Sequence, residues 1–323
     1  MRKFLLLFGH FAIPLLLLVQ MTPACAQASR TWVSGLGDDV NPCSRTAPCK
    51  TFAGAISKTA AGGEINCLDP GGFGALTITK AITIDCASTA AGVQVAGANG
   101  MAVNAQPGDV VTLRGLDFFG TGSGLNGILF NTGAALVVEK CTIRAFAAAG
   151  ESAGFGILFQ PTATSKLYVT DTEITNNGTG TTGGAIMVRP TGAGNAKAWI
   201  DRVSANNNVS GITASGGSTS GEAVVTIRES VAAGASSAGF AASTPASGGG
   251  TAFLFLERSS SFGNVTGLSS AGSKSNAVID GSMITANTTG LSAASGGSIF
   301  TYTNNSVFGN GTDGSTTNSL TPK

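Results

Sequence analysis

Charged side chains follow a recurring apolar residue along the chain, and four of them are the strongest candidates for chemistry. Asp171 and Asp201 could act as metal ligands or acid groups, with Lys140 or Arg202 as the base. The residues two positions after the apolar residue alternate in sign: Lys140, Asp171, Arg202, Glu229 and Arg258. Ion pairs between neighbouring strands predict strict alternation, whereas a metal site predicts clustered acids. We therefore expect a surface ladder of ion pairs and assign no catalytic or metal-binding residue.

Histidine and the exposed aromatic residues limit the chemistry further. The only histidine is His10, which lies in an N-terminal segment that we expect to be removed, so His-dependent catalysis and zinc sites are excluded. Tyr168 and Trp199 each come one residue before the recurring apolar residue, and strand alternation places both outward on neighbouring repeats. They form either a small platform for a sugar ring or a cross-strand aromatic pair.

Two apolar patterns recur from about residue 100 to the end of the chain. In the first, an apolar residue follows glycine, or once alanine, at spacings of 27, 29, 29, 26, 28, 28 and 23: Met101, Ile128, Ile157, Ile186, Ile212, Phe240, Leu268 and Leu291. In the second, apolar residues alternate with others around an anchor: Leu113, Val138, Val169, Ile200, Ile227, Leu256 and Ile279, with a weaker last anchor at Thr303. Period-2 alternation with β-branched residues predicts short strands with one buried face.

A fixed period of 23 to 31 residues indicates stacked units that are each too small to bury a core alone. A parallel β-helix fits best, in which each coil contributes about three strands and rises by about 4.8 Å. Crossovers between parallel strands are almost always right-handed. The leucine-rich and calcium-binding nonapeptide patterns are missing, and a propeller would need longer blades. The sequence therefore predicts an all-β, right-handed parallel β-helix over residues 63–323, with roughly nine or ten coils.

The N-terminal segment reads as a secretory signal peptide. Arg2 and Lys3 precede an apolar run, and a small-residue cleavage site ends at Ala26, so residues 1–26 are excluded from the fold. Cleavage leaves 297 residues with 16 basic residues (18 minus 2) against 17 acidic ones, a net charge of −1. A nearly neutral chain argues against nucleic acid or an anionic membrane as partner. We expect a secreted or periplasmic protein.

Export makes the cysteines informative, because disulfides form in oxidising compartments. Cys43 and Cys49 bracket a short loop, and we expect them to pair. Cys67 and Cys86 occupy matching places in two strands 19 residues apart, within bonding reach if those strands stack, and we expect them to pair as well. Cys141 is left over in a column of small residues and is expected to be a buried, inert thiol.

Asparagine follows the last strand of several repeats, at Asn177, Asn208, Asn264 and Asn287, and each opens an Asn-x-Ser/Thr sequence. One interpretation is N-glycosylation. The other is a turn position where asparagine tolerates left-handed geometry and stacks on its neighbours, and we favour this one.

Residues 27–62 resemble the N-terminal cap of right-handed parallel β-helix proteins of the pectin-lyase-like superfamily. The matching pieces are Gly37-Asp38-Asp39, Asn41-Pro42, Pro48, Lys50-Thr51, and a short amphipathic helix at residues 50–59 with Ala55 and Ile56 inward. The resemblance implies that this helix covers the open end of the first coil. The resemblance indicates the architecture, but it gives almost no information about activity.

The superfamily includes pectate lyases, polygalacturonases, alginate epimerases and phage tailspike glycosidases, besides many proteins without known activity. The Asn-Thr-Asp, Asp-Asp and His-Gly phrases of polygalacturonase-like sites are absent from the repeats. The Asp-Pro-His phrase of alginate epimerase-like sites is also missing, since Asp69-Pro70 is followed by Gly71. Two hypotheses remain. The first is a non-catalytic glycan-binding, adhesive or structural module that needs no cofactor. The second is a metal-assisted polysaccharide lyase that uses calcium. Both name a polysaccharide or cell-surface glycan as the partner.

Overall fold

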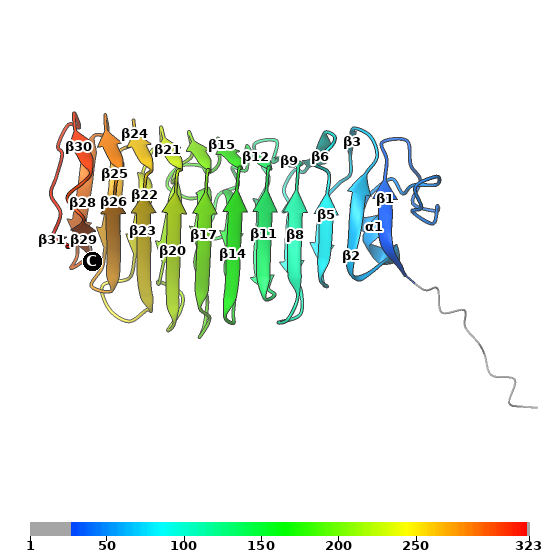
Figure 1. The fold of residues 1–323 in the computed structure, drawn as a ribbon, viewed down its shortest axis with the longest axis horizontal. Coiled ribbons are helices and arrows are strands. Elements are labelled where there is room, and N and C mark those ends of the chain that lie inside the picture. Colours follow the sequence, from blue (N-terminus) through cyan, green and yellow to red (C-terminus); the bar gives the residue numbers. More distant parts are fainter. Residues whose placement is uncertain (1–26, 322–323) are drawn as a thin grey trace, which may run out of the picture.

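The computed structural model describes residues 27–321, which form a parallel β-helix whose coils follow one another along a single axis (Figure 1). The predicted signal peptide, residues 1–26, lies outside the described residues. Within residues 27–321, no helix has the length and apolar character needed to cross a bilayer.

Three parallel sheets build the walls of the solenoid, and each full coil contributes one strand to each sheet. The twelve-stranded sheet contains, in spatial order, β1 (Ala28–Val33), β2 (Thr59–Cys67), β5 (Ile82–Asp85), β8 (Val110–Arg114), β11 (Ala135–Glu139), β14 (Ser165–Thr170), β17 (Ala196–Asp201), β20 (Glu222–Arg228), β23 (Thr251–Glu257), β26 (Ser275–Asp280), β29 (Ser298–Thr301) and β31 (Asn318–Ser319).

The ten-stranded sheet follows it along each coil. It contains β3 (Gly71–Gly72), β6 (Ala91–Gln94), β9 (Leu116–Phe119), β12 (Thr142–Arg144), β15 (Glu173–Thr175), β18 (Ser204–Asn206), β21 (Val231–Ala233), β24 (Ser260–Phe262), β27 (Met283–Thr285) and β30 (Ser306–Phe308). The nine-stranded sheet closes the coil with β4 (Leu76–Ile78), β7 (Met101–Asn104), β10 (Asn126–Thr132), β13 (Phe155–Phe159), β16 (Gly184–Val188), β19 (Ile212–Ser215), β22 (Ala238–Ser243), β25 (Thr266–Ala271) and β28 (Thr289–Ala294).

The register confirms the predicted apolar columns. In the twelve-stranded sheet, the anchors from Leu113 to Ile279 pair directly with one another across neighbouring strands. In the nine-stranded sheet, Ile157 pairs with Ile186, as does each member of the glycine-preceded column with the next. These side chains are buried and form one continuous core along the axis. The parallel β-helix that the resemblance implies is therefore confirmed.

The last anchor was wrong by two residues. Ile279 pairs with Thr301 and not with Thr303, because Ile299 and Thr301 are the alternating inward residues of β29. Thr303 lies beyond the strand, where its backbone N–H donates to the Thr301 hydroxyl. The run of small polar residues near this end offers few apolar side chains from which to read the alternation.

The glycine that precedes each apolar residue of the nine-stranded sheet allows a close approach of two walls. A Cβ on Gly127 would collide with the side chain of Ile143 from the ten-stranded sheet and with the carbonyl of Gly156 on the next coil. Gly267 stands in the same relation to Ile284. The recurring glycine is therefore a packing requirement of the narrow interior.

The segment before the first full coil contains the only helix among residues 27–321, α1 (Phe52–Lys58), which lies inside the predicted range of 50–59. Thr51 is its N-cap and accepts a hydrogen bond from the Gly54 N–H. Phe52 and Ala55 are buried, and the Phe52 ring packs on Phe73 with 5.2 Å between ring centroids. Ile56, which we expected to point inward with Ala55, is only partly buried against the core.

The two predicted disulfides, Cys43–Cys49 and Cys67–Cys86, are both present. The first closes a short loop before α1. The second joins the ends of β2 and β5, which are neighbours in the twelve-stranded sheet. Cys141 is free and buried, as predicted.

Candidate functional site

The charged residues of the predicted ladder occupy the turn that leads from the twelve-stranded to the ten-stranded sheet. Their backbones are left-handed, with φ between 44° and 52°, at Lys140, Asp171, Arg202, Glu229 and Arg258. Glycine occupies the equivalent turn at Gly115 and Gly281. This conformation costs an L-residue roughly 1–2 kcal/mol. Each charged side chain therefore sits at a position whose backbone would favour glycine.

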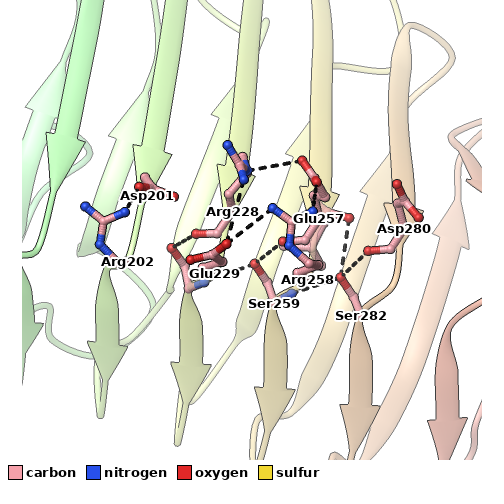
Figure 2. Close-up of polar contacts among 11 residues, drawn as sticks. Asp201, Arg202, Arg228, Glu229, Glu257, Arg258, Ser259, Asp280 and Ser282 are labelled. Carbon is pink, nitrogen blue, oxygen red and sulfur yellow. Dashed lines mark hydrogen bonds and ion pairs between the residues drawn. The ribbon is translucent and has the colours of Figure 1, made fainter.

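Arg202 joins the two acidic candidates. Its Nε lies 2.7 Å from Asp171 Oδ1 on the preceding coil. Figure 2 shows its ion pair with the adjacent Asp201, which its Nη1 makes. The hydrogen bond from Arg202 lowers the pKa of Asp171, and the pKa of Arg202 is raised by Asp171 and then by Asp201. Both carboxylates are thus occupied by one guanidinium, and a carboxyl with a lowered pKa is a weak general base.

A second column of charges lies one residue after most of the anchors, beside the charges of the ladder, and ion pairs join the two columns. Arg258 pairs with Glu229 at 3.2 Å and with the adjacent Glu257, and Arg228 lies 3.3 Å from Glu257 (Figure 2). In earlier coils, Arg114 bridges Asp85 at 3.0 Å and Glu139 at 2.7 Å. Arginine therefore connects most of these acids to a neighbouring coil.

The expectation of an uninterrupted ladder was wrong at two steps. Arg202 turns to Asp201 and makes no ion pair with Glu229, because the acid next to it in the chain is closer. Among residues 27–321, Lys140 takes part in no ion pair, although its charge helps to lower the pKa of Asp171. In the same range, no three His, Cys, Asp or Glu side chains converge as a metal site would require. Three of the four candidates, Asp171, Asp201 and Arg202, thus form an ion-pair network, and Lys140 stands outside it.

Tyr168 and Trp199 lie where the alternation predicted. They pair in register on β14 and β17, and each is 38 % exposed on the outer face of the twelve-stranded sheet. The guanidinium of Arg228 lies 5.5 Å from the centre of the Trp199 ring, within the range of a cation–π contact. The two residues are therefore neighbours on the outer face of the sheet, close to the charged residues that follow the anchors.

Two lysines complete this group, and the sequence analysis missed them. Lys166 and Lys197 pair directly with each other two residues before Tyr168 and Trp199, and both are exposed on the same face. Like charges directly opposite each other destabilise a strand pair. Neither lysine forms an ion pair within the described part of the chain. The anchor register was sufficient to reveal this pair, because both lie three residues before an anchor.

The aromatic pair belongs to a longer column, which we call the outer stripe. Its members lie one residue before each anchor and pair with one another from coil to coil: Val137, Tyr168, Trp199, Thr226, Phe255, Val278 and Phe300. Phe255 lies two coils beyond Trp199, and Phe300 two coils beyond Phe255, so their spacing is about 10 Å. Tyr168 and Trp199 are its most exposed rings, Phe255 and Phe300 are half-buried, and Val278 is buried.

The asparagine column points away from solvent. Asn177, Asn208, Asn264 and Asn287 are 1–3 % exposed. Their side chains bond to one another and to backbone groups of neighbouring coils, as in the 3.0 Å bond from Asn177 Nδ2 to Asn208 Oδ1. These amides are therefore occupied in the folded protein, which agrees with the turn interpretation and not with glycosylation.

Cys141 is shielded in the same way. It is 2 % exposed, and burial raises its pKa to about 12. Its Sγ lies 3.3 Å from the Glu139 carbonyl oxygen, and its N–H donates to the Thr172 hydroxyl. Such a thiol carries almost no thiolate at neutral pH, so it is unsuited to nucleophilic chemistry.

Comparison with known proteins gives similarity in architecture only. No family model and no curated protein matches the chain. Among solved structures, pectate lyase Pel9A is similar over 91 % of this chain and 80 % of its own, with 12 % identity and a TM-score of 0.44. A rhamnogalacturonan lyase is similar over 73 % of this chain and 82 % of its own, with 10 % identity and a TM-score of 0.23. Likeness at this level carries no argument about activity.

Proposed function

We propose that the protein is an exported, non-catalytic β-helix that binds an extended polysaccharide along the outer stripe. One observation carries the proposal: Tyr168 and Trp199 stand exposed and in register beside the like-charged pair Lys166 and Lys197. Aromatic faces offer apolar area against which the faces of sugar rings stack. The neighbouring charged columns supply donors and acceptors for sugar hydroxyls.

The lysine pair favours an acidic polysaccharide. Lys166 and Lys197 face each other without an acidic partner in the described structure, so an anionic group between them would remove their repulsion. The acids on the other side of the stripe are already engaged by arginines. They would therefore repel a polyanion less than free carboxylates would. Attraction of this kind weakens with salt.

The remaining parts of the chain support an extracellular role. Two disulfides fit an oxidising compartment, and we infer that residues 1–26 direct export and are cleaved after Ala26. We further infer that the solenoid is right-handed, and that α1 covers the apolar end of its first coil.

The proposal is tested by affinity electrophoresis against a panel of acidic and neutral polysaccharides. We expect retardation by acidic polymers, and at least a tenfold weaker interaction for Trp199→Ala and for Lys166→Ala/Lys197→Ala. Phe262→Ala is the matched control, because Phe262 is 46 % exposed but lies on the ten-stranded sheet. Equal losses for Phe262→Ala and Trp199→Ala would contradict the proposal.

The same panel tests the lyase alternative. Each polymer is incubated with the protein, with and without calcium, and the absorbance of unsaturated products is followed. We expect no product in either condition. Product formation that Arg202→Ala abolishes, without a loss of stability, would show that the charged columns are catalytic and that the non-catalytic proposal is wrong.

A further inference from the structure

An open concavity of about 690 Å³ lies at the N-terminal end of the twelve-stranded sheet, and we call it the N-terminal concavity. Its lining includes Trp32 from β1, Asn66 from β2, Asp85 from β5 and Arg45 from the loop before α1. Trp32 pairs in register with Asn66, and Asn66 with Asp85. These three outward residues therefore lie next to one another on neighbouring strands. Figure 1 shows these strands at the end of the solenoid that carries α1.

Both disulfides brace this concavity. The Trp32 N–H donates to the Cys43 carbonyl at 2.9 Å, and the Cys49 N–H donates to the Trp32 carbonyl at 2.9 Å. The Cys43–Cys49 bond therefore fixes the loop that carries Arg45 against the backbone of Trp32. The Cys67–Cys86 bond joins β2 to the end of β5, and Cys67 itself is part of the lining. Such bracing reduces the ordering that a ligand must impose.

The charges of the lining are compensated, with one exception. Glu64 is paired with Arg30 at 2.6 Å, and Asp85 is paired with Arg114 at 3.0 Å. Arg45 is exposed and enters none of the ion pairs among residues 27–321. The concavity thus combines an indole with one guanidinium that lacks a counter-charge. A guanidinium binds a carboxylate in a bidentate manner.

We propose that the N-terminal concavity is a second binding site, which takes one acidic sugar unit. The sugar ring packs on Trp32, and its carboxylate pairs with Arg45. The site lies six strands from β17, about 29 Å from Trp199 along the axis, so it does not depend on the outer stripe. A polymer chain that ends or branches at an acidic unit is the ligand that such a single-unit site fits.

The two tryptophans of the chain separate the two sites experimentally. Trp199→Phe leaves Trp32 as the only indole, and Trp32→Phe leaves Trp199. Each variant is titrated with cellobiouronic acid and with cellobiose, which differ by one carboxylate, and the tryptophan fluorescence is followed. In Trp199→Phe we expect a saturable change with cellobiouronic acid and at least tenfold weaker binding of cellobiose.

Arg45 variants test the charge, each made in the Trp199→Phe background. Arg45→Ala should abolish the preference for the acid, and Arg45→Lys should keep part of it. The control is Arg144→Ala, since Arg144 is an arginine of the ten-stranded sheet and should not affect the preference. Thermal unfolding verifies that each variant is folded. Equal affinities for the two disaccharides, no response of Trp32, or an unchanged preference in Arg45→Ala would each overturn the inference. A response confined to Trp32→Phe would also overturn it, while leaving the outer stripe as the binding surface.

Discussion

Arg202 donates two hydrogen bonds to the Asp171 carboxylate on the preceding coil, from Nε to Oδ1 at 2.7 Å and from Nη2 to Oδ2 at 3.2 Å. This paired arrangement fixes the relative position of two coils as well as neutralising their charges. A shift of one residue between the strands would separate the partners and turn the apolar anchors outward. The charged turns thus help to hold the register of the twelve-stranded sheet.

Changing Arg202 should therefore affect stability in a graded way. Arg202→Ala loses the pairs with Asp171 and Asp201, whereas Arg202→Glu places a third acid beside them and also faces Glu229. We expect the urea midpoint of Arg202→Glu to lie clearly below that of Arg202→Ala. The difference should shrink in molar salt, because exposed charges are screened. Identical midpoints in low salt would show that these charges do not interact.

The apolar columns could be predicted from the sequence because burial alone dictates them. Every second residue of each strand faces the core, so the apolar residues Val169 and Ile200 show which residues of β14 and β17 pair with each other. The choice of partner by Arg202 could not be predicted, since it depends on a left-handed backbone that aims the side chain at two acids at once. Nor does any sequence pattern show that Arg45 and Trp32 line one concavity, because the place of Arg45 depends on the course of a loop closed by a disulfide.

The asparagine column should be a major source of stability. Asn287 Oδ1 accepts from the N–H of Asn264 at 3.0 Å and from its Nδ2 at 2.9 Å, and Asn287 Nδ2 donates to the Ser261 carbonyl at 3.1 Å. Asn287→Ala leaves these buried groups without partners and should cost about 2–3 kcal/mol in the free energy of unfolding. Asn276→Ala, on the outer face of β26, is the control and should change little. Equal costs would contradict a special role for the column.

The column has one gap, which offers the reverse experiment. Ala235 is 3 % exposed and occupies the place of an asparagine, so the N–H of Asn208 finds no side-chain oxygen there. Its own N–H already donates to Asn264 Oδ1 at 2.8 Å. Ala235→Asn should complete the series and raise the free energy of unfolding by about 1 kcal/mol. Urea unfolding measures this change, and a loss of stability would mean that the turn has no room for the amide.

Two variants of Lys140 distinguish the destabilisation caused by its left-handed backbone from any stabilisation due to its charge. Its φ is 52°, and it makes no ion pair within residues 27–321. Lys140→Gly and Lys140→Ala both remove the charge, but only glycine adopts this backbone without strain. We expect Lys140→Gly to be the more stable of the two by about 1 kcal/mol in urea unfolding. Equal stability would show that the turn has changed its conformation.

Asp39 should make the N-terminal segment sensitive to acid. Its carboxylate accepts from the backbone N–H groups of Lys50 at 2.8 Å and Thr51 at 2.9 Å, and from the Thr51 hydroxyl at 2.7 Å. Burial alone would raise the pKa of Asp39, but the bonds from Thr51 and Lys50 outweigh it and lower the pKa. A lowered folded pKa means that the carboxylate contributes stability above the unfolded value of about 3.9, and that this contribution is lost as the pH falls through the folded pKa.

We therefore expect the start of α1 to loosen below about pH 4, with a change in Trp32 fluorescence in the Trp199→Phe background. Asp39→Asn keeps one acceptor oxygen and removes the charge. It should lower stability at neutral pH by about 1–2 kcal/mol and flatten the acid response. Asp38→Asn is the matched control, because the exposed Asp38 carboxylate accepts only from the nearby Val40 N–H, at 3.1 Å. If Asp38→Asn and Asp39→Asn gave the same dependence of Trp32 fluorescence on pH, the loosening would have to arise from carboxylates elsewhere on the solenoid. Asp39 would then not be the residue that holds the first loop against the helix.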